Sequence, residues 1–285
     1  MKYGFIREHQ HEYPVKTMCR VVQVSVSGYY AWQHRGPSER SKANAQLSKR
    51  IENVYQSNRQ VYGSPRIHAV LTTQGIQCGR KRIARLMRQA NLSAKPVQHR
   101  TRTTDSRHGH PVADNVLGRD FTADTPNTKW VADITGVWTT EGWLYLAAIL
   151  DVYSRFIVGW AMSSSRDATL VEDALTMAMG RRHPEAGLLH HSDRGSQYTS
   201  ADYQEQLAHG GMVVSMSRKG NCYDNAMMES FFGTFKAECA ERQVYQTRSQ
   251  ARQSIFEYIE TFYNRQRLHS SLGYVSPLVY EQPLS

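Results

Sequence analysis

Apolar residues in the first third of the chain recur with the period of an α-helix. The first forty residues contain short helical segments, with Met18, Val21 and Val22 at helical spacing before a small-residue turn at 25–28. From Ser41 the pattern is longer, and four apolar residues share one face of the next helix: Leu47, Ile51, Val54 and Tyr55. This part of the chain is therefore predicted to be helical throughout.

Two further helices follow, and the second is strongly basic. Ser64-Pro65 predicts a helix start, with Ser64 as the cap, and Gly75 predicts its end. The next helix begins near Arg80, and its buried face is expected to hold Ile83, Leu86 and Met87. Its other face carries three basic residues at i, i+4 and i+7: Lys81, Arg85 and Arg88. This pattern is typical of a DNA-binding helix-turn-helix, although the turn from Thr72 to Gly79 is long. A helical bundle with a solvated basic face is the alternative.

After Thr128 the apolar pattern changes to that of a sheet with intervening helices. The expected strands are Trp130–Trp138, Trp143–Asp151, Arg155–Met162, Leu188–His191 and Met212–Ser215. The expected helices are Ala168–Gly180, Ala201–His209 and a long one at about Tyr223–Ala240. Three antiparallel strands followed by alternating helices and strands predict a mixed sheet of the ribonuclease-H-like type.

Charge divides the chain at nearly the same place. The net charge is +10, but residues 1–124 hold 21 Lys and Arg against 8 Asp and Glu, a net +13. Residues 125–285 hold 14 against 17, a net −3. This asymmetry favours a nucleic-acid-binding part joined to a more neutral part, with a basic surface that has no partner as the alternative. The stretch 96–124 is predicted to be a basic linker along a phosphate backbone.

Several other classes of protein do not fit the sequence. The longest apolar run, Trp143–Leu150, has the length of a strand and is too short to cross a membrane. The start of the chain has no signal-peptide pattern, which favours a cytoplasmic protein. The four cysteines are widely spaced and form no Cys-x-x-Cys pair, so neither a disulfide framework nor a zinc knuckle is expected.

Three acidic residues stand out by their surroundings. Asp133 interrupts an apolar strand, where a carboxylate is costly unless it is paired or binds a cation. Asp193 directly follows a buried strand, and Glu229 lies among apolar residues of the last predicted helix. Converging at one edge of the sheet, the three could chelate two divalent ions for an in-line displacement at phosphorus. Taken singly, each has a structural explanation: a strand-end turn former, an Asx-turn and an exposed helix position.

The sequence around these acids resembles the catalytic blocks of bacterial insertion-sequence transposases. The matching segments are Thr128–Thr135, Gly142–Ala147, Leu150–Arg155, Val158–Trp160, His191–Tyr198 and Asn225–Phe232 with Lys236. Between Asp193 and Glu229 lie 35 residues, the spacing that names the DD(35)E group. The tail matches too, at Tyr263–Arg265, His269–Tyr274 and Ser276-Pro277. Over roughly residues 15–280 the chain thus resembles the OrfB product of the insertion-sequence-three family, which is related to retroviral integrases.

The resemblance implies an architecture and a metal site. An α/β catalytic domain, with a ribonuclease-H-like mixed sheet flanked by helices, would follow an all-α helix-turn-helix-type DNA-binding region. The expected divisions are a short N-terminal helical segment (1–40), a helix-turn-helix-like domain (41–95), a basic linker (96–124) and the catalytic domain with a C-terminal helical tail (125–285). Asp133, Asp193 and Glu229 would be the catalytic residues and the ligands of Mg²⁺ or Mn²⁺, expected as two ions. Zinc is not expected, because the Cys-x-x-Cys pair of the retroviral N-terminal module is missing.

The resemblance also implies a reaction and partners. Water would cut a phosphodiester at the end of the element, in its terminal inverted repeat, and the freed 3′-OH would attack the target DNA. Both steps would take place on double-stranded DNA, in the cytoplasm of a bacterium at its nucleoid. A homo-oligomer on DNA is expected, with OrfA or an OrfA–OrfB fusion as a further partner.

Several residues near the acids are candidates for lesser roles. In the family a Lys or Arg at the position of Lys236 lies against DNA, and Arg218 with Lys219 stands in a loop suited to phosphate; a solvated helix lysine is the alternative for Lys236. Asn225 could orient Glu229 or cap its helix. The pair His190-His191 is better explained as structural than as a metal site, because three carboxylates suit Mg²⁺.

Two other functions stay open at this point. A ribonuclease-H-like nuclease would cut without joining, and a domesticated relative would bind DNA without catalysis. The helix-turn-helix region argues against the first, and the presence of all three acids argues against the second.

Overall fold

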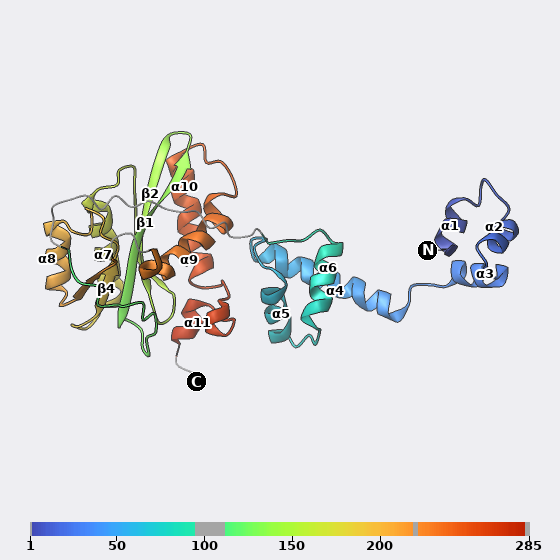
Figure 1. Cartoon of the computed structure of the whole chain (residues 1–285), viewed down its shortest axis with the longest axis horizontal. Helices are drawn as coiled ribbons and strands as arrows, with labels where there is room; N and C mark the ends of the chain where they lie inside the picture. Colours follow the sequence, from blue (N-terminus) through green and yellow to red (C-terminus); the bar gives the residue numbers. More distant parts are fainter. Residues whose placement is uncertain (1, 95–111, 219–221, 283–285) are drawn as a thin grey trace.

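Three short helices form a unit of their own near the N-terminus of the computed structural model, which describes residues 2–94, 112–218 and 222–282. They are α1 (Lys2–Glu8), α2 (Val15–Val21) and α3 (Val26–His34), in dark blue in Figure 1. Their core consists of Ile6, Met18, Cys19 and Tyr29. Two details differ from expectation. Val21, which the helical spacing groups with Met18, is 72% exposed, whereas Met18 is buried. Residues 25–28 form the cap and first turn of α3, because the Ser25 hydroxyl accepts a hydrogen bond from the Gly28 N–H.

The next three helices are the predicted ones, although the first begins two residues earlier and the N-cap of the second is a different residue. They are α4 (Glu39–Ser57), α5 (Ser64–Thr73) and α6 (Arg80–Gln89). The predicted apolar face of α6 is buried, as Ile83, Leu86 and Met87 are all at most 4% exposed. The N-cap of α5 is Gly63, and Ser64 makes no capping hydrogen bond, so the predicted serine cap is wrong.

The second half of the chain forms one mixed sheet of five strands. These are β1 (Lys129–Thr139), β2 (Gly142–Asp151), β3 (Ile157–Ser163), β4 (Leu189–Ser192) and β5 (Val213–Met216). Their order is β3-β2-β1-β4-β5, with β1 to β3 antiparallel and β4 and β5 parallel to β1. This is the ribonuclease-H-like arrangement that the sequence predicts.

Each face of the sheet is covered by helices. Side chains alternate along a strand, so Trp130, Ala132 and Ile134 enter the core beneath α7 (Ala168–Arg182) and α8 (Ala201–His209). Helix α7 lies very close to β3 at Gly159, where a Cβ would stand 2.2 Å from the Ala174 carbonyl oxygen. The opposite core contains Val131 and Val137 of β1 together with α9 (Ala226–Phe235). Asp133 shares the odd-numbered positions of β1 and therefore faces the α9 side.

The predicted long helix at 223–240 consists of three pieces. A 3₁₀ turn at Cys222–Asn225 leads into α9, which continues as a π-helical turn at Lys236–Ala240. The C-terminal tail comprises α10 (Arg248–Phe256), a π-helical stretch at Glu257–Tyr263, a 3₁₀ turn at Ser270–Leu272 and α11 (Pro277–Glu281).

The tail joins the helical region to the sheet region. The buried Tyr62 hydroxyl donates to the Gln266 carbonyl at 3.2 Å and accepts from the Leu268 N–H at 2.8 Å. Arg66 Nε donates to the Leu268 carbonyl at 2.7 Å. In Figure 1 the helices α4 to α6 accordingly lie beside the C-terminal part of the chain. Within the described ranges, no helix has the length and apolarity needed to cross a membrane.

Candidate active site

Asp133 is a buried carboxylate in the middle of β1. It is 6% exposed, and its Oδ1 accepts a hydrogen bond from the Ile134 N–H at 2.7 Å. Strand β4 pairs with β1 in parallel, and Val131 lies opposite His191. Asp133 follows Val131 by two residues, and Asp193 follows His191 by two residues. Because the two strands run in parallel, the backbone brings both acids to the same level at the end of β4.

Asp193 begins the loop after β4, and that loop is shaped around its carboxylate. Its Oδ1 accepts from the Gly195 N–H at 2.9 Å. A Cβ at Gly195 would stand 3.0 Å from the same Oδ1 and 2.8 Å from Gln197 Oε1. A larger residue here would push against the Asp193 carboxylate, so glycine leaves room for Asp193 in this position.

Glu229 is exposed in the first turn of α9. Asn225, one helical turn earlier, donates through Nδ2 to the Ala132 carbonyl at 3.1 Å. Its side chain makes no capping hydrogen bond. Of the two predicted roles for Asn225, capping is therefore absent, and its amide fastens the start of α9 to β1 beside Asp133. Glu229 is carried on a helix that is bonded to the strand of the first acid.

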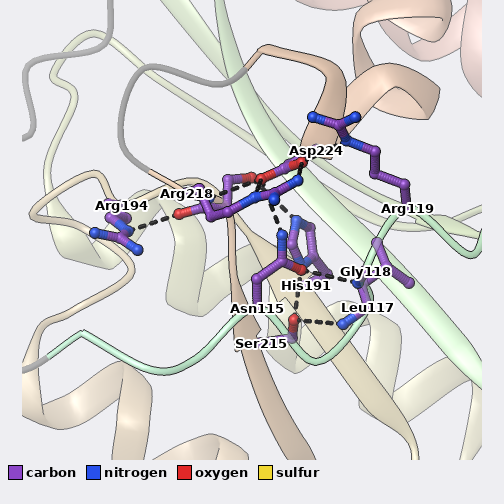
Figure 2. Close-up of polar contacts among 10 residues, drawn as sticks. Asn115, Leu117, Gly118, Arg119, His191, Arg194, Ser215, Arg218 and Asp224 are labelled. Atoms are coloured by element: carbon purple, nitrogen blue, oxygen red, sulfur yellow. Dashed lines mark hydrogen bonds and ion pairs between the residues drawn. The ribbon is translucent and has the colours of Figure 1, made fainter.

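A buried acid that the sequence analysis missed, Asp224, organises the segment before α9 (Figure 2). Arg218 binds the fully buried Asp224 carboxylate through Nε, its terminal nitrogen and its backbone N–H, each at 2.9 Å. Arg119 Nε and Asn115 Nδ2 donate to it at the same distance. Hydrogen bonds from Arg218 hold the pKa of Asp224 well below its usual range, although burial opposes this. The only sequence signal for Asp224 is its place beside the third catalytic block.

The same network fastens the described end of the linker, residues 112–124, to the sheet. The Leu117 N–H donates to Ser215 Oγ at 3.0 Å, and the Gly118 N–H donates to Asn115 Oδ1 at 2.9 Å. Ser215 in turn contacts His191 Nδ1 at 2.8 Å. This part of the predicted linker thus packs on the catalytic domain, as Figure 2 shows.

The two histidines before Asp193 have structural partners. His191 lies between the hydroxyls of Ser215 and Ser217, at 2.8 and 3.0 Å, and His190 Nε2 lies 3.0 Å from the Tyr203 hydroxyl. Burial lowers the pKa of His191 to about 4 and that of His190 to about 3, so both are neutral near pH 7. These contacts agree with the prediction that His190 and His191 have a structural role.

The candidate DNA-contact residues occupy different environments. Lys81, Arg85 and Arg88 are exposed on α6. Arg218 is exposed but bound to Asp224, and Lys236 is half-buried where α9 becomes π-helical. Lys219 lies outside the described residues.

The donor set suits a hard cation, but the three acids do not form a closed cluster. Among residues 2–94, 112–218 and 222–282, no group of three or more His, Cys, Asp or Glu side chains could hold a metal ion. Mutual repulsion between carboxylates disfavours their close approach without a cation. Asp133 and Asp193 nevertheless offer oxygen ligands at one level of the sheet, and oxygen is the donor that Mg²⁺ prefers. The shared metal site stays a prediction.

Comparison with protein families divides the chain into recognisable parts. Residues 123–222 match an integrase core domain, and residues 210–277 match a second model of the integrase core domain. Residues 42–100 match an HTH-like domain.

Curated relatives match along nearly the whole chain. The insertion element IS600 uncharacterized 31 kDa protein of Shigella sonnei is 47% identical over 265 residues, covering 93% of this chain and 97% of that protein. The transposase InsF for insertion sequence IS3A of Escherichia coli (strain K12) is 43% identical over 283 residues, covering 99% of this chain and 98% of that protein.

Solved structures that match this chain at low sequence identity include a viral intasome and a viral integrase core domain. The simian T-cell lymphotropic virus intasome in complex with PP2A regulatory subunit B56 gamma covers 75% of this chain and 70% of its own, at 13% identity and a TM-score of 0.46. The match to the HTLV-2 integrase catalytic core domain in complex with magnesium covers 56% of this chain and 100% of that domain, at 13% identity and a TM-score of 0.41.

Proposed function

Because the chain belongs to the IS3-type insertion-sequence transposases with an integrase core domain, we propose that Asp133, Asp193 and Glu229 are its catalytic metal ligands. The chain is a transposase and hence a polynucleotidyl transferase that acts in DNA transposition. The observation that carries the proposal is the level placement of Asp133 and Asp193 beside a helix that carries Glu229.

The three acids would hold the cations from three different elements of the fold. Asp133 is rigid, because it is buried in the central strand. Asp193 is presented by the Gly195 loop, and Glu229 would complete the site from α9. Bound there, two Mg²⁺ ions would activate the attacking oxygen and stabilise the leaving oxygen of an in-line displacement.

Both chemical steps fit one site. In the first, water attacks the phosphodiester at the element end, and the bond to the 3′ oxygen breaks to leave a 3′-OH. In the second, that 3′ oxygen forms a new bond to a target phosphorus and displaces the neighbouring 3′ oxygen. No side chain becomes bonded to DNA, so a nucleophilic Ser or Tyr is not required.

The basic face of α6 is proposed to bind the DNA backbone. Lys81, Arg85 and Arg88 are exposed on one side of a helix whose other side is buried. Lys236, Arg218 and Lys219 would contact DNA nearer the cut. We place the reaction on bacterial DNA in the nucleoid, carried out by a homo-oligomer with OrfA or an OrfA–OrfB fusion.

The metal-ligand assignment is tested with the amide variants Asp133→Asn, Asp193→Asn and Glu229→Gln of the full chain. Each keeps the shape of the side chain and removes a charged ligand. Cleavage and joining of an element-end duplex with Mg²⁺ should fall at least about a thousandfold, or ~4 kcal/mol, while DNA binding persists. The matched control is the exposed acid Glu205, as Glu205→Gln. Wild-type strand transfer in any one of the three would remove that residue from the site.

The DNA-contact assignment is tested by the triple alanine variant of Lys81, Arg85 and Arg88. Each neutralised phosphate contributes a slope of about −0.9 to the dependence of log affinity on log salt. The variant should therefore bind DNA more weakly, and its log affinity should fall less steeply with log salt, by up to about three units of slope. Isotherms on end-sequence and scrambled duplexes separate base reading from backbone tracking. An unchanged slope would mean that this face of α6 does not touch DNA.

A further inference from the structure

Helices α2 and α3 form a second, tighter helix-turn-helix, outside the residues that match the HTH-like domain. Four residues, 22–25, join the two helices, whereas six, 74–79, join α5 to α6. Within the short turn Gln23 has a φ of 55°, the left-handed conformation that lets the chain reverse within so few residues. Ser25 then caps α3 by accepting from the Gly28 N–H at 3.0 Å.

The inner sides of both helices form a small core with α1. Met18, Cys19 and Tyr29 are at most 6% exposed. Partly buried residues of the turn and of α3 complete the core: Val22, Val24 and Trp32. The buried positions thus come from both helices and from the turn between them.

The outer side of α3 is exposed and has the chemistry of a groove-reading helix. Val26, Ser27, Tyr30 and His34 stand at i, i+1, i+4 and i+8, on one face, and all four are exposed. Tyr30 is 46% exposed despite its size. Hydroxyl and imidazole groups bond base edges or phosphates, and a small apolar side chain such as valine suits the thymine methyl group.

The helix before the turn carries positive charge beside this face. Lys16 and Arg20 are exposed and lie one turn apart on α2. Residues 2–35 contain five Lys and Arg against two Asp and Glu. In a helix-turn-helix the first helix crosses the phosphate backbone while the second enters the major groove. Basic residues on α2 and polar, aromatic and small apolar residues on α3 match that division.

We propose that α2 and α3 form a second double-stranded DNA-binding unit, with α3 in the major groove and Lys16 and Arg20 on the backbone. It extends the proposed function, because it adds a DNA contact separate from α6. Figure 1 places α1 to α3 beyond the N-terminal end of α4, away from the sheet. Helix α4 has 19 residues and so spans about 28 Å. A single chain would therefore hold an element end at two separated places.

The first test removes the backbone contacts from the full chain. With Lys16→Ala and Arg20→Ala together, the salt slope of binding to an element-end duplex should fall by up to about two. The matched control removes two exposed charges far from this unit, Arg242→Ala with Arg265→Ala. A slope equal to wild type, or an equal fall in the control, would overturn the proposal.

The second test guards against loss of folding. Ser27→Glu adds a negative charge in the first turn of α3, where it favours the helix but repels phosphate. Binding should weaken at least about tenfold while the helical circular dichroism is unchanged. Equal affinity for DNA would overturn the proposal and assign the face to another partner. Magnesium-dependent cleavage at saturating protein is measured in parallel, so that a failure here is distinguishable from a failure of the proposed metal site.

Discussion

The strand-borne acids and the helix-borne acid are held in place by different kinds of contact. Asp133 accepts a hydrogen bond from the next residue, Ile134, and Asp193 accepts one from Gly195, two residues further along the chain. Glu229 depends on distant partners, because the start of α9 is bonded to β1 through Asn225. The segment before α9 is bonded through Asp224 to Arg119, more than a hundred residues away.

Asp133 and Asp193 therefore reach their positions when the sheet forms, whereas Glu229 reaches its position only when the whole domain is assembled. The positions of the two strand acids follow from the pairing of β1 with β4. The position of α9 requires the docked linker and the C-terminal tail, where Arg267 makes a buried bidentate ion pair with Glu238. Changes on the strand side should therefore act on catalysis alone, and changes on the helix side on catalysis and stability together.

Among the changes that test this difference, the largest effect is expected from Gly195→Ala, beside Asp193. The added methyl group would stand 2.8 Å from Gln197 Oε1 and 3.0 Å from Asp193 Oδ1, so both side chains must shift to make room. A misplacement of about 1 Å costs about a hundredfold in rate, which is the upper limit of the loss expected here. Cleavage rates with saturating Mg²⁺ measure the effect. Gly180→Ala is the control, because a Cβ there meets nothing within 4 Å. A variant as active as wild type would show that Asp193 need not stay where the loop holds it.

The next effect concerns pH and the tail that supports α9. Burial lowers the pKa of His269 to about 2, and its ring packs edge-on against Tyr263. The unfolded chain, with a pKa near 6.5, binds the proton more readily, so stability is full above pH 6.5 and is lost as pH falls below it. Between pH 6.5 and 5 the loss from this group is about 2 kcal/mol.

His269→Phe keeps the ring and removes the titration. Urea denaturation of wild type and variant at pH 7 and pH 5 should show the smaller pH difference in the variant. His190 and His191 are also buried and neutral, so some acid sensitivity persists in both. The exposed His209, as His209→Gln, is the control. Equal pH differences in wild type and His269→Phe would contradict the burial argument.

The smallest effect is expected from Asp224→Asn, on the helix side. The substitution leaves Arg119 and Arg218 without their carboxylate, so the segment before α9 loses its anchor. We expect about a tenfold fall in activity, or ~1.4 kcal/mol, with a higher Mg²⁺ requirement and a lower melting temperature. Asp202→Asn, an exposed acid on α8, should change none of these. If activity and Mg²⁺ requirement both match wild type, the anchor does not position Glu229.

Patterns of apolar residues predicted most of the fold. The predicted β1, β2 and α8 agree with the structure to within one or two residues, because buried elements this long leave a clear period in the sequence. The family assignment is confirmed by relatives at 43–47% identity. The roles of the three acids stay predictions, although Asp133 in β1 and Asp193 directly after β4 lie at the same level.

The features that were missed depend on contacts distant in sequence. In the sequence, Asp224 is one more polar residue at the start of a predicted helix, because only folding brings Arg119 and Asn115 to it. The break of the last long helix into 3₁₀, α and π segments is also hidden, because the three share similar apolar spacing over a few residues. The helix-turn-helix at 15–34 is short and carries little charge on α3, so its apolar positions read only as helical fragments.

The docking of Tyr62 and Arg66 onto residues 266–268 has a consequence for where the DNA is cut. Those contacts join the helical region to the domain that carries the three acids without passing through residues 95–111. A duplex held at α6 would then be presented to Asp133 at a separation set by packed side chains. The fold would then set the number of base pairs between the DNA contact at α6 and the phosphodiester that is cut.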